Sequence, residues 1–403
     1  MKASMGRAAI VLGLLAAVGP FAIDMYLPAM PTIAADLGAS QAATQATLTS
    51  FFAAFGASQL LYGPAADSFG RKPPLYFGLS LFLVGSLICA AAPSIAVLIG
   101  ARALQGLGAA AVMVVPRAII RDLYTGVEAT RLMALVMLVI SISPMLAPSI
   151  GGALIAALHW RAVFAAVLLA ALLAFLLSAF VLGETWPKER RGPFAPLAVG
   201  RAYVSLFRDL RFLGLTFIGA SGMASFFTFL ASSSFLYIGH YGLTPNQYGL
   251  AFAANAIGFF AASQFAAPLS ERFGVEPIVK SATSAFAAFA LAMFLTFQAG
   301  VDSLAALMPM LALTFACLGL VIPTTMVLAL DEQGERAGLA SALGGALQMG
   351  AGALCILLVG LLPKGDARSM TSVIALMAIF GLILTRLILR GQRAAKTAPS
   401  AAE

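Results

Sequence analysis

Twelve long apolar runs constrain this chain more than any other feature of its sequence. Each run supplies the roughly 20 apolar residues that a helix needs to cross the hydrocarbon core of a bilayer. A transmembrane β-barrel would instead show short segments of alternating hydrophobicity. We therefore predict an all-α integral membrane protein with twelve transmembrane helices, at 8–33, 44–65, 73–92, 94–120, 131–157, 160–182, 212–238, 246–267, 277–298, 303–329, 337–362 and 369–389.

Composition argues against a soluble domain. The chain is 61% hydrophobic and only 10% charged, whereas soluble domains carry about 25% charged residues. The start of the chain, with Lys2 and Arg7 before an apolar core, also fits a signal peptide. The apolar run continues past a cleavable length into a proline-rich motif, so we expect it to remain as the first span.

The basic residues sort by loop, and this sorting predicts the orientation. One side of the membrane carries only the basic residues Arg161, Lys364 and Arg368. The other basic residues of the loops lie on the opposite side. The positive-inside rule then places both termini and the central loop in the cytoplasm. The net charge of +8 reflects this bias and an attraction to anionic lipid, rather than a nucleic-acid partner. The residues of the basic side are Lys2, Arg7, Arg71, Lys72, Arg121, Arg131, Lys188, Arg190, Arg191, Arg201, Arg208, Arg211, Arg272, Lys280, Arg336, Arg386, Arg390, Arg393 and Lys396.

The chain divides into two six-helix halves. We predict an N-terminal bundle at 1–182, a cytoplasmic linker at 183–211 with a surface helix, a C-terminal bundle at 212–390 and a cytoplasmic tail at 391–403. The stretch FGASQLLYGPAADSFG in the first half aligns with FFAASQFAAPLSERFG in the second at a constant offset. Chance similarity between apolar helices is the alternative, but the shared Pro-x-x-acid-x-Phe-Gly core favours duplication. Duplicated halves are typical of transporters that bind substrate near the midplane between them.

Four motifs carry a resemblance to a known family. They are IDMYLPAMP (23–31), YGPAADSFGRKP (62–73), RALQGLGAAAVMVVPRAIIRD (102–122) and SPMLAPSIGG (143–152). With them the chain resembles the major facilitator superfamily, and within it the Bcr/CflA group of drug:proton antiporters. The chain departs from the family pattern at Ala147, where glycine is frequent. It also has Val275 and Glu276 in place of Arg71 and Lys72 in the second copy of the loop.

The resemblance implies proton-coupled export of small amphipathic antimicrobials across a bacterial cytoplasmic membrane by alternating access. It implies a monomer that needs no cofactor or metal. Transport of a native metabolite stays open as an alternative, and a membrane-embedded enzyme or channel is a weaker one. The sequence shows no metal-ligand cluster and no nucleophile–base arrangement, and we expect Cys89, Cys317 and Cys355 to be packing residues.

Asp24 is the one acidic residue that lies well inside a span. A charge at bilayer depth costs about 2.5–3.5 kcal/mol on insertion scales, so such residues are functional candidates. Pro28 has no N–H to offer the carbonyl of Asp24, which predicts a bent helix at this point. Irregular backbone within a membrane lines a cavity or is buried in protein, so we expect Asp24 to face the interior.

Arg102 is the basic residue placed most clearly inside a span, at a depth that matches Asp24. The matching depths make an ion pair between the two side chains geometrically possible. One interpretation is a permanent pair that fixes packing; the other is a switch, in which protonation of Asp24 competes with drug binding. Gln105 lies three residues after Arg102 and is expected on the same face.

The resemblance also assigns a cytoplasmic latch to Gly63, Asp67, Gly70, Arg71 and Asp122. In this interpretation Arg71 pairs with Asp122, and Asp67 interacts with the positive N-terminal end of a helix in the other half. A simpler interpretation is a turn glycine surrounded by charges that set the topology.

The predicted fifth helix carries the antiporter motif of the family at Pro144, Pro148, Gly151 and Gly152. We expect these residues to form a hinge or a close seal between the halves. Candidate substrate contacts are Tyr26, Gln105, Tyr237 and Asn255, which are polar or aromatic residues within spans; each also fits a packing role.

Overall fold

The computed structural model describes residues 5–362 and 366–389. Within these ranges every regular element is a helix, which confirms the all-α prediction. Lys2, Lys364, the basic residues from 390 onward and the predicted tail at 391–403 lie outside the described residues.

The first half contains seven α-helices. A 3₁₀ turn at Leu27–Ala29 separates the first two of them. The helices are α1 (Met5–Asp24), α2 (Met30–Asp36), α3 (Gln41–Phe69), α4 (Lys72–Ala91), α5 (Ile95–Leu123), α6 (Gly126–Ala157) and α7 (Trp160–Val181).

The linker and the second half contain eight more. A short π-helix at Phe235–His240 extends α9, and 3₁₀ turns lie at Lys188–Arg190 and Gly334–Arg336. The helices are α8 (Pro196–Phe207), α9 (Leu210–Ser234), α10 (Pro245–Gln264), α11 (Ala266–Phe273), α12 (Val275–Gln298), α13 (Leu304–Asp331), α14 (Ala337–Leu361) and α15 (Ala367–Ile388). Helix α8 is the surface helix expected in the linker.

Each of the twelve expected spans coincides with a helix or with a pair of helices in line. In the described part of the chain, eleven helical segments are long and apolar enough to cross a membrane. Helix α3 is the twelfth and is more polar, because Thr44, Gln45, Thr47 and Ser58 lie on its buried face.

Helix starts are set by side chains that accept hydrogen bonds from free backbone N–H groups. Ser40 caps α3 by accepting from Ala43 at 3.1 Å. Thr244 and Gln247 form a reciprocal capping box at the start of α10. Asp209 caps α9, and its carboxylate also accepts from Gln333 at 3.0 Å. Although burial acts to raise the pKa of Asp209, the hydrogen bonds from the Phe212 N–H and Gln333 bring that pKa below its usual value.

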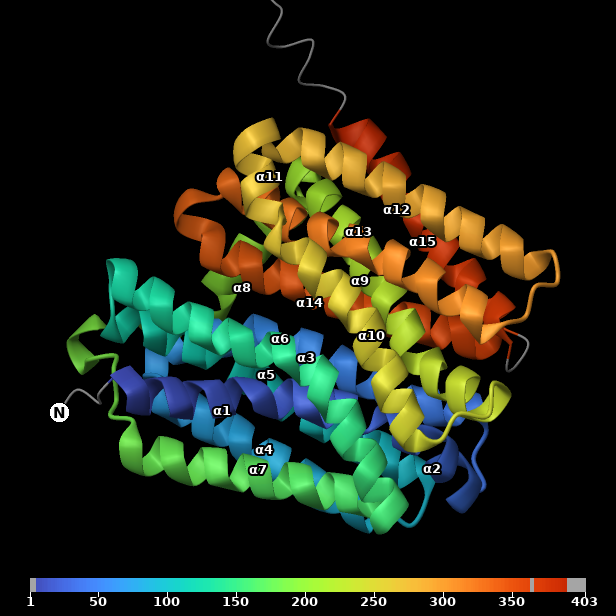
Figure 1. The fold of residues 1–403 in the computed structure, drawn as a ribbon. Helices are drawn as coiled ribbons and strands as arrows, with labels where there is room; N and C mark the ends of the chain where they lie inside the picture. Colours follow the sequence, from blue (N-terminus) through green and yellow to red (C-terminus); the bar gives the residue numbers. More distant parts are fainter. Residues whose placement is uncertain (1–4, 363–365, 390–403) are drawn as a thin grey trace, which may run out of the picture.

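The two halves lie side by side as bundles with roughly parallel long axes (Figure 1). Helix α3 contacts α14, and α6 contacts α10, so these two pairs form the main interface between the halves. The outer helices are α4 and α7 on one side, and α12 and α15 on the other. We call the end that carries α8 the linker end, and the opposite end the α2 end.

Candidate functional site

A cavity of about 250 Å³ lies between the halves. Its wall is apolar apart from Asp24 and Asn255, and phenylalanine is its most frequent residue. Phe229 and Asn255 are candidate drug contacts from the sequence, but the other phenylalanines are not, because helical spacing alone does not show which apolar face turns toward the other bundle. The lining residues are Gly19, Pro20, Ile23, Asp24, Phe52, Phe55, Met113, Ile140, Pro144, Met223, Phe226, Phe227, Phe229, Leu230, Phe252, Asn255, Ala256, Phe259, Phe260, Phe315, Ile322 and Met349.

The first span breaks at Asp24, as the prolines predict. Helix α1 ends at Asp24, a 3₁₀ turn follows at Leu27–Ala29, and α2 begins at Met30. Pro28 lies within the turn, where its missing N–H cannot continue the helical hydrogen bonds. Asp24 is 5% exposed and lies on the cavity wall.

The ion pair between Asp24 and Arg102, which their matching depths allow, does not form in this state. Among the described residues, no salt bridge joins the two side chains, although both are buried. Arg102 Nη1 instead donates to the backbone carbonyl of Ala22 at 3.2 Å and to the side chain of Gln105. Arg102 therefore contacts the backbone of α1, and the side chain of Asp24 lies in the cavity wall without it.

Arg102 is enclosed by aromatic rings. Its guanidinium carbon lies 4.8 Å from the ring centre of Tyr26 and 4.3 Å from that of Phe51, which is cation–π geometry. Gln105 donates to Ser86 at 2.8 Å, and so links Arg102 to α4. Tyr26 and Gln105, predicted as substrate contacts, therefore surround Arg102 and are not part of the cavity wall.

Asn255 and Tyr237 occupy different layers of the second half. Asn255 lines the cavity, and its Nδ2 donates to the hydroxyl of Tyr237 at 2.9 Å. Tyr237 is fully buried behind it. The Oδ1 atom of Asn255 has no partner in the described part of the chain. Asn255 thus forms part of the cavity wall while its Oδ1 atom stays buried, and Tyr237 holds the orientation of its amide.

The motif of the predicted fifth helix, now α6, closes the α2 end. A Cβ atom at Gly152 would lie 2.5 Å from the carbonyl oxygen of Pro245 in the second half, and one at Gly151 would lie 2.2 Å from that of Met25. On the facing helix, a Cβ at Gly249 would lie 2.7 Å from the backbone of Ser149. Only glycine permits such close backbone approach.

The two prolines of the motif lie beside this seal. Pro144 lines the cavity and Pro148 is buried. Both lie within the continuous helix α6. The geometry therefore matches the expected close seal between the halves.

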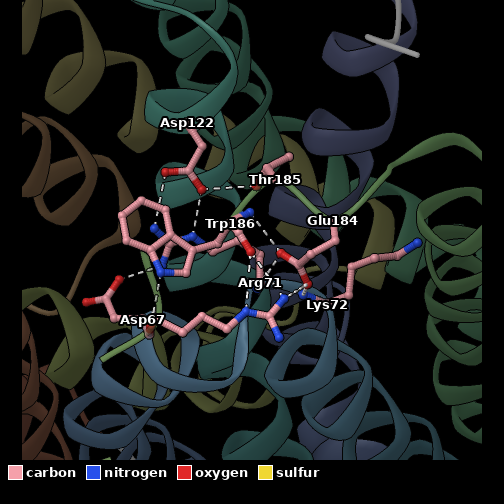
Figure 2. A network of polar contacts seen from close by, with 8 residues as sticks. Asp67, Arg71, Lys72, Asp122, Glu184, Thr185 and Trp186 are labelled. Atoms are coloured by element: carbon pink, nitrogen blue, oxygen red, sulfur yellow. Dashed lines mark hydrogen bonds and ion pairs between the residues drawn. The ribbon is translucent and has the colours of Figure 1, made fainter. Parts of the chain in front are cut away.

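At the linker end, Arg71 is the centre of a charged network (Figure 2). Its Nε donates to Asp122 Oδ2 at 2.7 Å and its Nη2 to Oδ1 at 3.1 Å, so the predicted contact between Arg71 and Asp122 is confirmed. Both side chains are less than 10% exposed, at 5% and 8%. Gly70 has a φ of +95°, the backbone conformation that turns α3 into α4. Gly63 lies one turn before Asp67, and a Cβ there would meet nothing within 4 Å.

The expected contact of Asp67 with the other half is wrong for this state. Its carboxylate pairs with Arg71, four residues along the chain, and its side chain is 67% exposed. The two residues flank the positive-φ turn at Gly70, so the pair joins the last turn of α3 to the start of α4.

The linker supplies the residues of this network that the sequence analysis missed. Glu184 accepts hydrogen bonds from the backbone N–H groups of Arg71 at 2.8 Å and Lys72 at 3.1 Å. The indole of Trp186 donates to the carbonyl of Asp67 at 2.9 Å, and its ring centre lies 4.5 Å from the Arg71 guanidinium carbon. Thr185 donates to Asp122 at 3.0 Å. The polar cluster ETW directly after the sixth span was the available signal.

The halves separate toward the linker end on the side of α6. Helix α11 continues α10 in that direction, but its main neighbours are α10, α12 and α13 rather than α6. Arg117, on the central helix α5, is exposed. The cavity is therefore sealed by backbone contacts at the α2 end, whereas on the α6 side the two halves pack less closely toward the linker end.

The described residues contain no group of three or more His, Cys, Asp or Glu side chains that could hold a metal ion. Cys89, Cys317 and Cys355 are buried and unpaired with one another. The candidate site therefore consists of the Asp24 carboxyl group, the Asn255 amide and a wall of aromatic side chains.

Comparison with known proteins identifies the family. Residues 12–356 and 220–403 match the model of the Major Facilitator Superfamily. An uncharacterized MFS-type transporter, YdgK of Bacillus subtilis, is 34% identical over 94% of this chain and 96% of its own length. A bicyclomycin resistance protein homolog of Haemophilus influenzae is 31% identical over 90% of both chains. Multidrug resistance protein D of Escherichia coli is 31% identical over 93% of both chains.

The fold also matches a solved structure. The crystal structure of a D-xylose-proton symporter superposes with a TM-score of 0.74, covering 96% of this chain and 97% of the other at 16% identity. At this identity the likeness concerns the fold alone.

Proposed function

The chain belongs to the Major Facilitator Superfamily as a secondary transporter, and we propose that it exports small amphipathic antimicrobials across the bacterial cytoplasmic membrane in exchange for protons. Two relatives that match it over most of their length are named for resistance to bicyclomycin or to multiple drugs. The observation that carries the proposal is the apolar cavity between the halves, with Asp24 in its wall.

The cavity suits a small molecule with an apolar body and a hydrogen-bond donor. Phenylalanine and methionine side chains offer an adaptable apolar wall, which is typical of sites that accept many ligands. The Asp24 carboxyl group in the wall can accept a hydrogen bond from such a molecule. Arg102 does not compete with a ligand for the Asp24 carboxyl group, because aromatic rings and backbone enclose its guanidinium group.

Asp24 is the proposed proton-binding group. In this state its carboxyl is not committed to Arg102, so protonation requires no ion pair to break. Arg102 contributes by holding the carbonyl of Ala22 two residues before the break in the first span. In our proposal, proton and drug compete for the carboxyl group, and the halves rock around it as the protein changes access.

The proposed orientation places both termini and the linker in the cytoplasm. This assignment rests on the positive-inside rule applied to the loops. The α2 end then faces outward, and the state described here is closed to the outside. In this setting the protein is proposed to act as a monomer surrounded by lipid.

The test compares drug susceptibility of cells that express the wild type or Asp24→Asn. Wild type should raise the tolerated drug concentration several-fold, and a protonophore should abolish the difference. Asp24→Asn should give no protection at equal expression, whereas Asp36→Asn, a substitution at an exposed carboxyl of the same span, should protect. Full protection by Asp24→Asn would refute the proposed coupling. Protection that persists with the protonophore would refute proton-driven export.

A further inference from the structure

Gln45 is a buried amide that reaches from the first half into the second. It lies on α3 and is 1% exposed. Its Nε2 donates to the backbone carbonyl of Ala231, on α9, at 3.0 Å. Its Oε1 lies against α14, where a Cβ at Gly360 would be 3.2 Å away. One side chain of the first half therefore contacts two helices of the second, near the α2 end.

The acceptor on α9 is available because the helix changes its hydrogen-bond pattern at this point. The N–H of Phe235 donates to Ser232, three residues back, where a regular α-helix would use Ala231. The segment Phe235–His240 that follows is π-helical, and the N–H of Tyr241 donates five residues back to Leu236 at 2.9 Å. Single π turns of this kind are frequent at functional sites.

Two polar atoms near Gln45 could form hydrogen bonds with a water molecule. Its Oε1 and the hydroxyl of Ser232 are buried without a partner in the described part of the chain. Both residues line a small cavity of about 20 Å³ that also includes Gln41 and Asp366. A polar space of this size admits one water molecule. The contact can therefore exchange its protein partner for water as the halves separate.

From this geometry we propose that Gln45 is the latch of the α2 end. Its hydrogen bond to Ala231 holds α3 against α9 and α14 in the state closed at the α2 end. The bond breaks when the transporter changes to the state that is open at this end. The assignment rests on the alternating access of the proposed function, but it does not depend on which substrate is carried or on proton coupling.

Gln45→Leu removes the donor and keeps most of the volume, which leaves the carbonyl of Ala231 buried and unpaired. The cost of such an orphaned group corresponds to about a tenfold shift in equilibrium. Gln41→Leu is the matched control, since Gln41 lies one turn earlier on α3 in the same small cavity and has no hydrogen bond to the second half among the described contacts.

The measurement is the distance between spin labels at Ala35→Cys and Ala299→Cys, both exposed at the α2 end of opposite halves. The labels are placed in purified full-length protein in which the three buried native cysteines are replaced by alanine. Wild type and Gln41→Leu should give mainly the short distance. Gln45→Leu should raise the ratio of long to short distances about tenfold.

A distribution for Gln45→Leu that coincides with that of Gln41→Leu would overturn the proposal, as would a wild type without the short distance. If Gln45→Leu fails to fold, Gln45→Asn replaces it, because an amide one methylene shorter cannot reach Ala231. The labelled protein needs no drug, so failure of the latch can be distinguished from failure of drug export.

Discussion

The two ends of the molecule use polar groups in different ways. At the linker end, Arg71, Asp122 and Glu184 form a charged network that joins α3, α4 and α5 to the linker. At the α2 end, the described contacts between the halves include the neutral amide of Gln45 and glycines that lie against the backbone of the facing half.

The difference shows which contacts can change during transport. Removing one partner of a buried ion pair costs about 3–5 kcal/mol, because the other charge is left without compensation. A neutral hydrogen bond contributes about 0.5–1.5 kcal/mol, and water can replace its partner. In this state the charged network therefore holds one half and the linker together as a unit, while the seal between the halves depends on contacts that can open.

The largest effect is expected when the charged network loses its centre. Arg71→Ala leaves the 8% exposed carboxylate of Asp122 without its cation, and should lower stability by about 3–5 kcal/mol. Thermal unfolding in detergent measures this loss of stability. Drug efflux should also fall at least tenfold, because less of the protein stays folded. Arg121→Ala, at an exposed arginine beside Asp122 on α5, is the control. Equal stability of the two variants would contradict the assigned role of Arg71.

A smaller effect is expected at the seal of the α2 end. In Gly152→Ala, the new Cβ would lie 2.5 Å from the carbonyl oxygen of Pro245, so the closed state should lose about 1–3 kcal/mol. The labels at Ala35→Cys and Ala299→Cys should then report mainly the open distance. Gly350→Ala is the matched control, because its Cβ meets nothing within 4 Å. A short distance retained in Gly152→Ala would show that the seal lies elsewhere.

The smallest effect is expected at the exposed ion pairs of the α2 end. The hydroxyl of Tyr241 and the imidazole of His240 donate to Asp302, and these contacts lower the pKa of that carboxyl. A lowered pKa in the folded state stabilises above the unfolded value of about 3.9, and the contribution is lost as the pH falls through the folded-state pKa.

Asp302→Asn should therefore cost less than about 1 kcal/mol at pH 7, because the site is solvent-exposed. The difference from wild type should shrink as the pH falls below the usual aspartate pKa of about 3.9. Unfolding temperatures measured across pH test this, and a difference that grows toward acid pH would contradict the assignment.

The sequence predicted those parts of the molecule that depend on local pattern. Hydrophobic length predicts the twelve helices, Pro28 predicts the break after Asp24, and the glycines of α6 predict a close seal. The Arg71–Asp122 contact followed from the family resemblance.

Pairing across the interior could not be predicted in the same way. Equal depth in the bilayer suggested that Asp24 meets Arg102, but depth does not specify the direction of a side chain around its helix. Arg102 is turned toward Ala22, Tyr26 and Phe51 instead. The role of Gln45 depends on a local change of hydrogen bonding near Ala231, which composition and spacing do not encode.

Access to the cavity tests the central claim most directly, namely that the cavity is shut at the α2 end and loosened at the linker end. A single cysteine at Met113, a residue of the cavity wall, is introduced into protein without native cysteines. A membrane-impermeant thiol reagent is then applied to right-side-out and inside-out vesicles. The account predicts rapid labelling in inside-out vesicles, where the linker end faces the reagent in the proposed orientation, and slow labelling in right-side-out ones. Faster labelling from the α2 side would contradict it.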